Sequence, residues 1–122
     1  MIGVVTASLK PTLQVVVIGS GGQLRAIEAT VDTGFTGFLT LPPGLIALLG
    51  LVLLGQHQGL LADGSVSRFN VYRGEILWDG LRRTVNIDEM DHDPLLGTAL
   101  LQDHEIRIRM VPGGMVEVVM IP

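Results

Sequence analysis

The stretch ATVDTGFTGFLTLP, residues 29–42, carries a single carboxylate, that of Asp32, between two apolar runs. The turn residues Thr33 and Gly34 follow the carboxylate directly. Such an Asp-Thr-Gly sequence is common in solvated turns, since Asp and Gly both favour turn conformations. Here the flanking runs predict burial, where a carboxylate costs free energy unless it is hydrogen-bonded or functional. Asp32 is therefore either a structural turn residue or a functional carboxylate.

The composition limits the classes of protein to consider. With 122 residues the chain is long enough for one domain, 1–122, with a sizeable core. It is 48% hydrophobic and 16% charged, which predicts that part of the surface is covered by a partner. The net charge of −4, with Lys10 as the only Lys, provides no basic stripe for nucleic acid. Because there is no Cys, we expect no disulfide, thiolate metal site or cysteine nucleophile.

The sequence shows no targeting or membrane signal. Residues 1–7 lack a basic segment followed by a long apolar one, so they do not resemble a signal peptide. No apolar run reaches the roughly 18–20 residues that a membrane span requires. We therefore expect a cytoplasmic protein without a membrane partner.

The first third of the chain predicts strands at 1–9, 13–18 and 24–31. Between the last two lies the glycine cluster 19–22, which also resembles the start of a dinucleotide-binding fingerprint. Its third glycine position is Leu24, and residues 23–31 are too short for a crossover helix and another strand. A hairpin turn is the favoured interpretation, and nucleotide binding is the weaker alternative.

The remainder is also rich in predicted strands. A strand at 38–41 leads into a short helix at 45–49, with Pro43 near its start and Gly50 at its end. The pairs Asp63-Gly64 and Asp79-Gly80 are hairpin signals, so residues 51–88 predict a three-stranded meander, with a possible bulge at Gly74. Residues 95–101 predict a strand passing into a short helix near 98–103. The final predicted strands are 105–110 and 115–121.

Three features in this order resemble the retroviral-type (retropepsin-like) aspartic proteases, and their bacterial and archaeal group in particular. The first is the Asp32, Thr33, Gly34 triplet after an apolar strand. The second is a long hairpin in the place of the family's flap, and the third is an apolar pair before glycine that packs beside the triplet in that family. The resemblance implies an all-β fold, a closed barrel or folded sheet with one or two short helices. It assigns Phe35, Leu61, Ala62, Asp63 and Gly64 to substrate binding and the flap, and Leu96 and Gly97 to the supporting loop.

The resemblance also implies a mechanism. Peptide hydrolysis by these enzymes uses two carboxylates that share a proton, one activating water and the other polarising the carbonyl. This chain has one Asp-Thr-Gly, so the second Asp32 would come from a second copy in a homodimer. The substrate would be a peptide or protein, and no metal or organic cofactor is needed. Thr33 would hydrogen-bond across the twofold axis, and Gly34 would allow close approach of the backbone.

Two positions depart from the viral pattern. After Asp-Thr-Gly the viral enzymes have Ala-Asp, where this chain has Phe35 and Thr36. After the supporting glycine they have Arg, where this chain has Thr98. Both members of a viral ion pair are thus neutral here, which avoids leaving one charge unpaired. Phe35 either narrows the substrate cleft or fills the core.

Other polar residues have simpler explanations. The Asp91, His92, Asp93 segment predicts a solvated acidic loop rather than a metal site, which needs several placed ligands. His57 and His104 are expected at the surface. Because a fold does not determine a function, the main alternative to a protease is a non-catalytic binding or dimerisation module on the same fold.

Overall fold

The computed structural model describes residues 1–60 and 63–122. These residues form ten strands and two short helices. In chain order they are β1 (Ile2–Val5), β2 (Pro11–Ile18), β3 (Leu24–Val31), β4 (Leu39–Leu41), α1 (Pro43–Leu49), β5 (Val52–Leu60), β6 (Val66–Trp78), β7 (Leu81–Glu89), β8 (Leu95–Leu96), α2 (Thr98–Leu101), β9 (His104–Ile108) and β10 (Met115–Met120).

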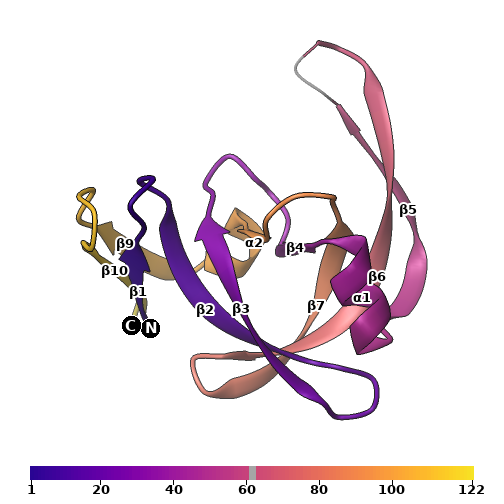
Figure 1. Cartoon of the computed structure of the whole chain (residues 1–122), viewed down its shortest axis with the longest axis horizontal. Helices are drawn as coiled ribbons and strands as arrows, with labels where there is room; N and C mark the ends of the chain where they lie inside the picture. Colours follow the sequence, from indigo (N-terminus) through magenta and orange to yellow (C-terminus); the bar gives the residue numbers. More distant parts are fainter. Residues whose placement is uncertain (61–62) are drawn as a thin grey trace.

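The strands form one sheet that folds back on itself (Figure 1). Its order is β5-β6-β7-β4-β8-β3-β2-β1-β10-β9, and β6 also pairs with β2. This extra pairing joins β2, β3, β8, β4, β7 and β6 into a ring of neighbours. The buried aliphatic core contains residues from all of these strands and from both helices. The predicted all-β class with one or two short helices is confirmed.

Strand β3 shows why these residues form a half-buried strand. Ile27, Ala29 and Val31 are buried and alternate with more exposed residues, as the two-residue period of a strand requires. Strand β2 pairs with it antiparallel from Thr12 to Ile18, so the glycine cluster 19–22 is part of a hairpin turn. The hairpin interpretation is therefore confirmed, and the dinucleotide-binding alternative is wrong.

The meander predicted for residues 51–88 is confirmed as β5, β6 and β7. Asp79 and Gly80 turn between β6 and β7 with positive φ angles of 53° and 79°. The bulge predicted at Gly74 is wrong, since Gly74 pairs in register with Val85. The irregularity lies in β5, where the register shifts between Leu53 and Gly55. Gly74 is explained by packing, because an added Cβ would overlap the side chain of Ile87.

Both helices are short and end where the backbone leaves the helical region. Helix α1 begins at Pro43 and ends at Leu49, and the next residue, Gly50, adopts a left-handed conformation with φ 61°. Helix α2 ends at Leu101, earlier than predicted, because Gln102 has an extended ψ of 139° and Asp103 has a positive φ of 66°. The turn at 102–103 then leads into β9. No helix in the described ranges 1–60 and 63–122 is long and apolar enough to cross a membrane.

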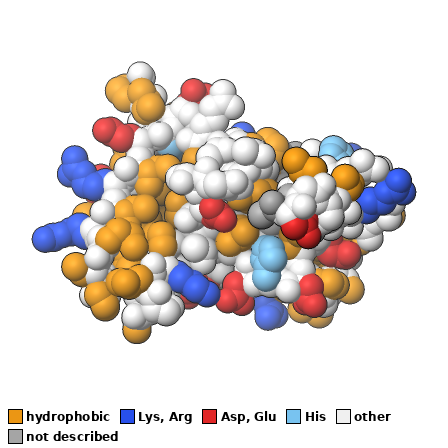
Figure 2. Space-filling view, turned by 90° about the horizontal axis from the view of Figure 1, so that it is seen from above, with side chains coloured by type: hydrophobic (Ala, Val, Ile, Leu, Met, Phe, Trp, Pro, Cys, Tyr) orange, Lys and Arg blue, Asp and Glu red, His pale blue; other side chains and the backbone are white. Residues whose placement is uncertain are grey.

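The terminal strands lie side by side at one end of the molecule (Figure 1). The first strand is shorter than predicted, because the chain turns at residues 6–10 and Leu9 has a positive φ of 63°. Strand β1 pairs antiparallel with β10, with Val4 opposite Met115. Figure 2 shows hydrophobic side chains gathered at this end of the molecule, where Ile2, Val4 and Met115 are exposed.

Candidate active site

The candidate site is built around Asp32, the first residue after β3. Val31 is buried in the core, Asp32 is half-buried, and Thr33 and Gly34 are exposed. The backbone N–H of Asp32 donates to the carbonyl oxygen of Leu96 at 2.9 Å. Its Oδ1 accepts the N–H of Gly34, also at 2.9 Å. The carboxylate is thus held at the point where a buried strand becomes an exposed turn.

Gly34 leaves space beside the Asp32 carboxylate. An added Cβ at Gly34 would lie 3.2 Å from Oδ1 of Asp32, closer than most such contacts. A side chain there would therefore crowd the carboxylate, and glycine leaves this approach open.

The loop carrying Asp32 is fixed by β8, which lies between β3 and β4. Strand β8 pairs parallel with β3 and antiparallel with β4 at Leu39. Three backbone N–H groups after β8 donate to the loop. These bonds are Gly97 to Phe38 at 2.9 Å, Thr98 to Phe35 at 2.8 Å and Ala99 to Gly37 at 3.1 Å. Residues far apart in sequence thereby hold the Asp32 loop on both sides.

Gly97 allows the two segments to approach this closely. An added Cβ would overlap the carbonyl oxygen of Gly37 and would lie 2.7 Å from that of Phe35. Gly97 has an ordinary φ of −104°, so the requirement for glycine is steric rather than conformational. Leu96, directly before it, is fully buried in the core. The two residues predicted as the supporting loop therefore lie directly against the Asp32 loop.

Phe35 is half-buried, and its ring packs against Gly37 and Gly97. Its Cδ2 would lie 2.6 Å from a Cβ added at Gly97, and its Cζ would lie 2.5 Å from one added at Gly37. The ring thus fills the space that two glycines leave. Thr36 is exposed, and Thr98 begins α2. Both side chains are neutral, so neither position needs a partner of opposite charge.

The hairpin of β5 and β6 extends from the body on the same side as the loop between β3 and β4 (Figure 1). Its strands pair up to Leu60 and Val66. Asp63 and Gly64 lie at its tip, whereas Leu61 and Ala62, also predicted for the flap, lie outside the described residues.

Asp63 makes two hydrogen bonds to Ser65 at the hairpin tip. Oδ1 of Asp63 accepts the backbone N–H of Ser65 at 2.9 Å and also the Ser65 hydroxyl. These bonds, the hydroxyl first, lower the pKa of Asp63 from its ordinary value. Gly64 takes a φ of 84°, which favours glycine. No hydrogen bond between described residues joins this tip to the Asp32 loop.

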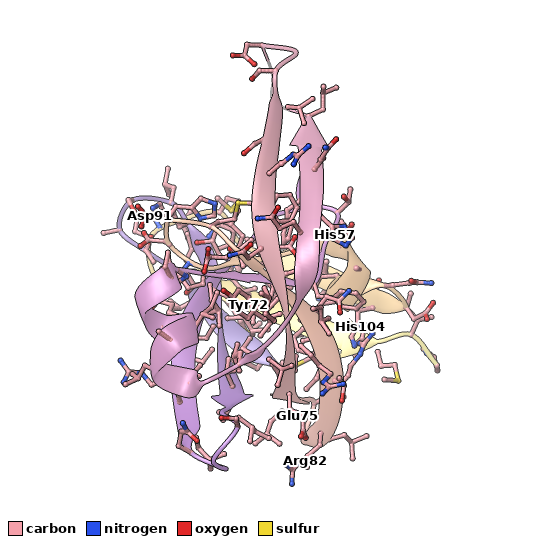
Figure 3. The ribbon with its side chains drawn as sticks, turned by 90° about the vertical axis from the view of Figure 1, so that its right-hand side faces the viewer. His57, Tyr72, Glu75, Arg82, Asp91 and His104 are labelled. Atoms are coloured by element: carbon pink, nitrogen blue, oxygen red, sulfur yellow. The ribbon has the colours of Figure 1, made fainter. Side chains whose placement is uncertain are left out.

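A polar cluster between the hairpin base and the Asp32 loop was not predicted. Asp88 on β7 is half-buried, and its Oδ2 would lie 3.2 Å from a Cβ added at Gly37. Burial raises the pKa of Asp88, and the nearby charge of His57 opposes that shift. Next to it, Glu89 accepts the Tyr72 hydroxyl at 3.1 Å. Figure 3 shows His57 and Tyr72 on the hairpin.

The burial pattern of β7 explains why the sequence does not predict this cluster. Val85 and Ile87 alternate with exposed residues, and this pattern predicts Asp88 on the solvent side. It is instead half-buried because β4 pairs with β7 and brings Thr40 opposite it. Two adjacent carboxylates, Asp88 and Glu89, at the end of an alternating strand were the signal available in the sequence.

The two remaining histidine predictions differ in outcome. His57 is exposed, as predicted. The surface prediction for His104 is wrong, because its Nε2 accepts the indole N–H of Trp78 at 3.2 Å and the two rings stack edge to face. Asp91, His92 and Asp93 form an exposed loop, with Asp93 3.6 Å from Lys10. No cluster of metal-ligating side chains occurs among the residues that the structure describes.

Comparison with known proteins supports the fold. No protein-family model and no curated protein sequence matches the chain. Among solved structures, the chain is similar to EIAV protease complexed with the inhibitor HBY-793, with a TM-score of 0.54 and 18% sequence identity. The match covers 77% of this chain and 86% of that chain. The chain therefore has a retropepsin-like fold.

Proposed function

We propose that this chain is an aspartic endopeptidase of the bacterial and archaeal retroviral-type group, active as a homodimer with one Asp32 from each subunit. The observation that carries the proposal is the presentation of the Asp32 carboxylate on a loop locked between β3, β8 and β4. The retropepsin-like fold supports it.

The environment of Asp32 favours a functional carboxylate over a structural one. One oxygen accepts the N–H of Gly34, whereas no described residue donates a hydrogen bond to the other oxygen. The ion pairs between described residues, Lys10 with Asp93 and Arg82 with Glu75, leave Asp32 without a cation. A turn aspartate needs no such fixed loop behind it, because its hydrogen bond is local. The rigid support is what a catalytic group requires.

The second carboxylate has to come from another copy, since the chain contains one Asp-Thr-Gly. Thr33 and Gly34 are exposed beside Asp32, so a second copy can approach the carboxylate across a twofold axis. We assign to Thr33 a hydrogen bond across that axis. Gly34 keeps the space at the carboxylate open.

The proposed reaction is direct addition of water to a peptide carbonyl. One carboxylate of the pair is ionised and accepts a proton from water, while the other donates its proton to the carbonyl oxygen. The carboxyl group that took the proton from water then donates it to the amide nitrogen, while the other carboxylate accepts a proton from a hydroxyl group of the tetrahedral intermediate. The C–N bond breaks, the amine leaves, and the pair again shares one proton. The β5–β6 hairpin would close over the peptide and exclude water. Phe35, whose ring packs against Gly37 and Gly97, would support the loop rather than line a subsite.

Digestion of a diverse peptide library, read by mass spectrometry from about pH 3 to about pH 8, tests the proposal. Wild type is compared with Asp32→Asn, and Asp91→Asn in the exposed acidic loop is the matched control. We expect cleavage by wild type and Asp91→Asn only, with a rate that falls once both carboxylates of the pair ionise. Equal cleavage by Asp32→Asn would refute the assignment. No cleavage by a confirmed dimer would favour the binding module.

A further inference from the structure

A pocket lies where β6 changes one of its partner strands. On the side away from β7, β6 pairs with β5 as far as Arg73 and with β2 from Glu75 onward. Strands β5 and β2 therefore diverge at Gly74, which among the described strands pairs only with β7. The space between them, here called the β6 pocket, has a volume of about 380 Å³. This is within the size range of sites that bind small molecules.

Two arginines and one glutamate line the β6 pocket. Because alternate residues of a strand point to the same face, Arg73 and Glu75 lie on one face of β6. The Nε–H of Arg82 donates to Oε2 of Glu75 at 2.9 Å. Arg73 forms no ion pair with any carboxylate in the described ranges 1–60 and 63–122. These three side chains carry a net charge of +1, in a chain whose net charge is −4.

The other residues of the pocket supply polar groups and an apolar wall. Thr84 of β7 is exposed on the same face as Glu75, which it pairs with directly. The glycine turn 19–22 brings Ser20 to the rim. Ile18 and Val52, where β2 ends and β5 begins, form the aliphatic wall. The pocket therefore combines a positively charged side with an apolar side.

The C-terminal end of α1 lies beside this turn, and its carbonyl groups accept hydrogen bonds from the turn. The carbonyl oxygen of Leu49 accepts the backbone N–H of Ser20 at 2.9 Å and the Ser20 hydroxyl at 3.4 Å. The carbonyl oxygen of Leu48 accepts Nε2–H of Gln23 at 3.4 Å. The partial negative charge of a helix end repels anions. Here the donors of the turn offset that charge.

We propose that the β6 pocket is a binding site for an organic carboxylate with an apolar body. The guanidinium group of Arg73 pairs with the carboxylate through two parallel N–H donors. Arg82, held in place by Glu75, adds a second positive group beside it. The apolar body of the ligand lies against Ile18 and Val52.

The charge of the lining selects a carboxylate over other ligands of similar size. A cation would face two guanidinium groups, and the one carboxylate of the lining is already paired. A phosphate monoester carries a charge of about −1.5 to −2 at neutral pH, which exceeds the +1 of the lining. A carboxylate carries one negative charge and matches it. A neutral molecule offers Arg73 no ionic partner.

The β6 pocket shares no lining residue with the Asp32 loop, so the proposal does not rest on the proposed proteolysis. Figure 3 shows Glu75 and Arg82 near the end of the molecule opposite the tip of the β5–β6 hairpin. Binding can therefore be measured without an assay of cleavage.

The test is a titration of the full ¹⁵N-labelled chain, followed by the NMR signals of its backbone amides, with three probes that share one aromatic ring. Benzoate carries one negative charge, phenyl phosphate carries nearly two, and benzyl alcohol carries none. We expect benzoate to shift the signals of Gly19, Gly74 and Thr84 and to bind about tenfold or more tightly than benzyl alcohol. Phenyl phosphate should bind no more tightly than benzoate, and added salt should weaken the binding of both.

Substitutions at arginine test which group holds the carboxylate. Arg73→Gln should weaken benzoate binding by about tenfold to a hundredfold, because it removes the charged donor. Arg73→Lys keeps the charge but not the paired donors, so its affinity should lie between those of wild type and Arg73→Gln. Arg68→Gln is the matched control, since Arg68 is exposed on the same strand and lies outside the pocket. It should bind as wild type does. The amide spectrum of each variant without ligand verifies that it is folded.

A peptide probe, N-acetylglycylphenylalanine, distinguishes two sources of the carboxylate. Tighter binding than benzoate assigns the site to the C-terminus of a peptide, and weaker binding assigns it to a small free acid. The proposal is overturned if benzoate shifts none of the three amide signals at millimolar concentration. It is also overturned if benzyl alcohol binds as tightly as benzoate, if phenyl phosphate binds more tightly, or if Arg68→Gln loses as much affinity as Arg73→Gln.

Discussion

Replacement of Gly97 by Ala should displace the Asp32 loop. The added Cβ would overlap the carbonyl oxygen of Gly37 and lie within 2.7 Å of both the ring and the carbonyl oxygen of Phe35. Two of these three atoms belong to the backbone, so a change of side-chain rotamer cannot relieve the contact. Either the loop or α2 has to move.

The loss of stability can be estimated from the steric overlap and the hydrogen bonds at that position. Overpacking of a dense site costs about 1–3 kcal/mol. Movement of the loop also weakens the three backbone hydrogen bonds from residues 97–99, each worth about 1 kcal/mol. We expect Gly97→Ala to lower the free energy of unfolding by about 2–5 kcal/mol. If the proposed function is right, the misplaced carboxylate also lowers the rate of cleavage by about a hundredfold.

Equilibrium unfolding in urea, at one fixed protein concentration, measures this change. Trp78 is the only Trp and is 4% exposed, so its fluorescence reports loss of the core. Gly44→Ala is the control, because Gly44 lies in α1 with nothing within 4 Å of an added Cβ. That variant should be as stable as wild type or about 0.5–1 kcal/mol more stable.

A second substitution separates the ring from the backbone. In the Gly97→Ala background, Phe35→Ala removes one of the three close contacts. It should therefore lower the free energy of unfolding by less there than in wild type. A free energy of unfolding of Gly97→Ala within about 0.5 kcal/mol of wild type would show that residue 97 is not crowded by the Asp32 loop. Equal costs of Phe35→Ala in both backgrounds would show that the ring does not contact residue 97.

Three further substitutions have defined outcomes. His104→Phe should cost about 1–3 kcal/mol in urea unfolding, because the buried indole N–H of Trp78 loses its acceptor; His104→Gln, which keeps an acceptor, should cost less. Burial raises the pKa of Asp88, so the folded state binds its proton more tightly, and the stability of wild type falls as pH rises through and above the ordinary value of 3.8. The stability of Asp88→Asn minus that of wild type should therefore be larger at pH 7 than at pH 3. An equal difference at the two pH values would contradict this. Gly80→Ala should cost about 1–2 kcal/mol of thermal stability, because Gly80 has a φ of 79° and nothing within 4 Å of an added Cβ, which leaves backbone strain as the cause.

Local features of the fold could be predicted from the sequence. Asp79 and Gly80 form the predicted turn because their positive φ angles suit these residue types. Gly50 ends α1 for the same reason. The strand ending at Val31 follows from its own two-residue alternation. In each case the deciding contacts lie within a few residues.

Long-range contacts could not be predicted in this way. The position of β8 between β3 and β4 requires segments more than 50 residues apart to pair, and nothing in residues 95–96 specifies a partner. The requirement for glycine at position 97 arises from Gly37 and Phe35, not from its own backbone angle. His104 is likewise predicted at the surface because it is polar, but β9 brings it to Trp78, 26 residues earlier. Asp88 is half-buried because of pairing with β4, which its own strand does not reveal.

The central claim is that two copies of Asp32 form one site, and a subunit-mixing experiment tests it most directly. Wild type is incubated with an equal amount of Asp32→Asn until subunits exchange, and peptide cleavage is then measured at a concentration that maintains the dimer. If both carboxylates are required, random exchange leaves about a quarter of dimers competent, so activity falls to about half that of the same amount of wild type alone. Unchanged activity, with exchange verified by mass spectrometry, would show that one Asp32 is sufficient and would contradict the account.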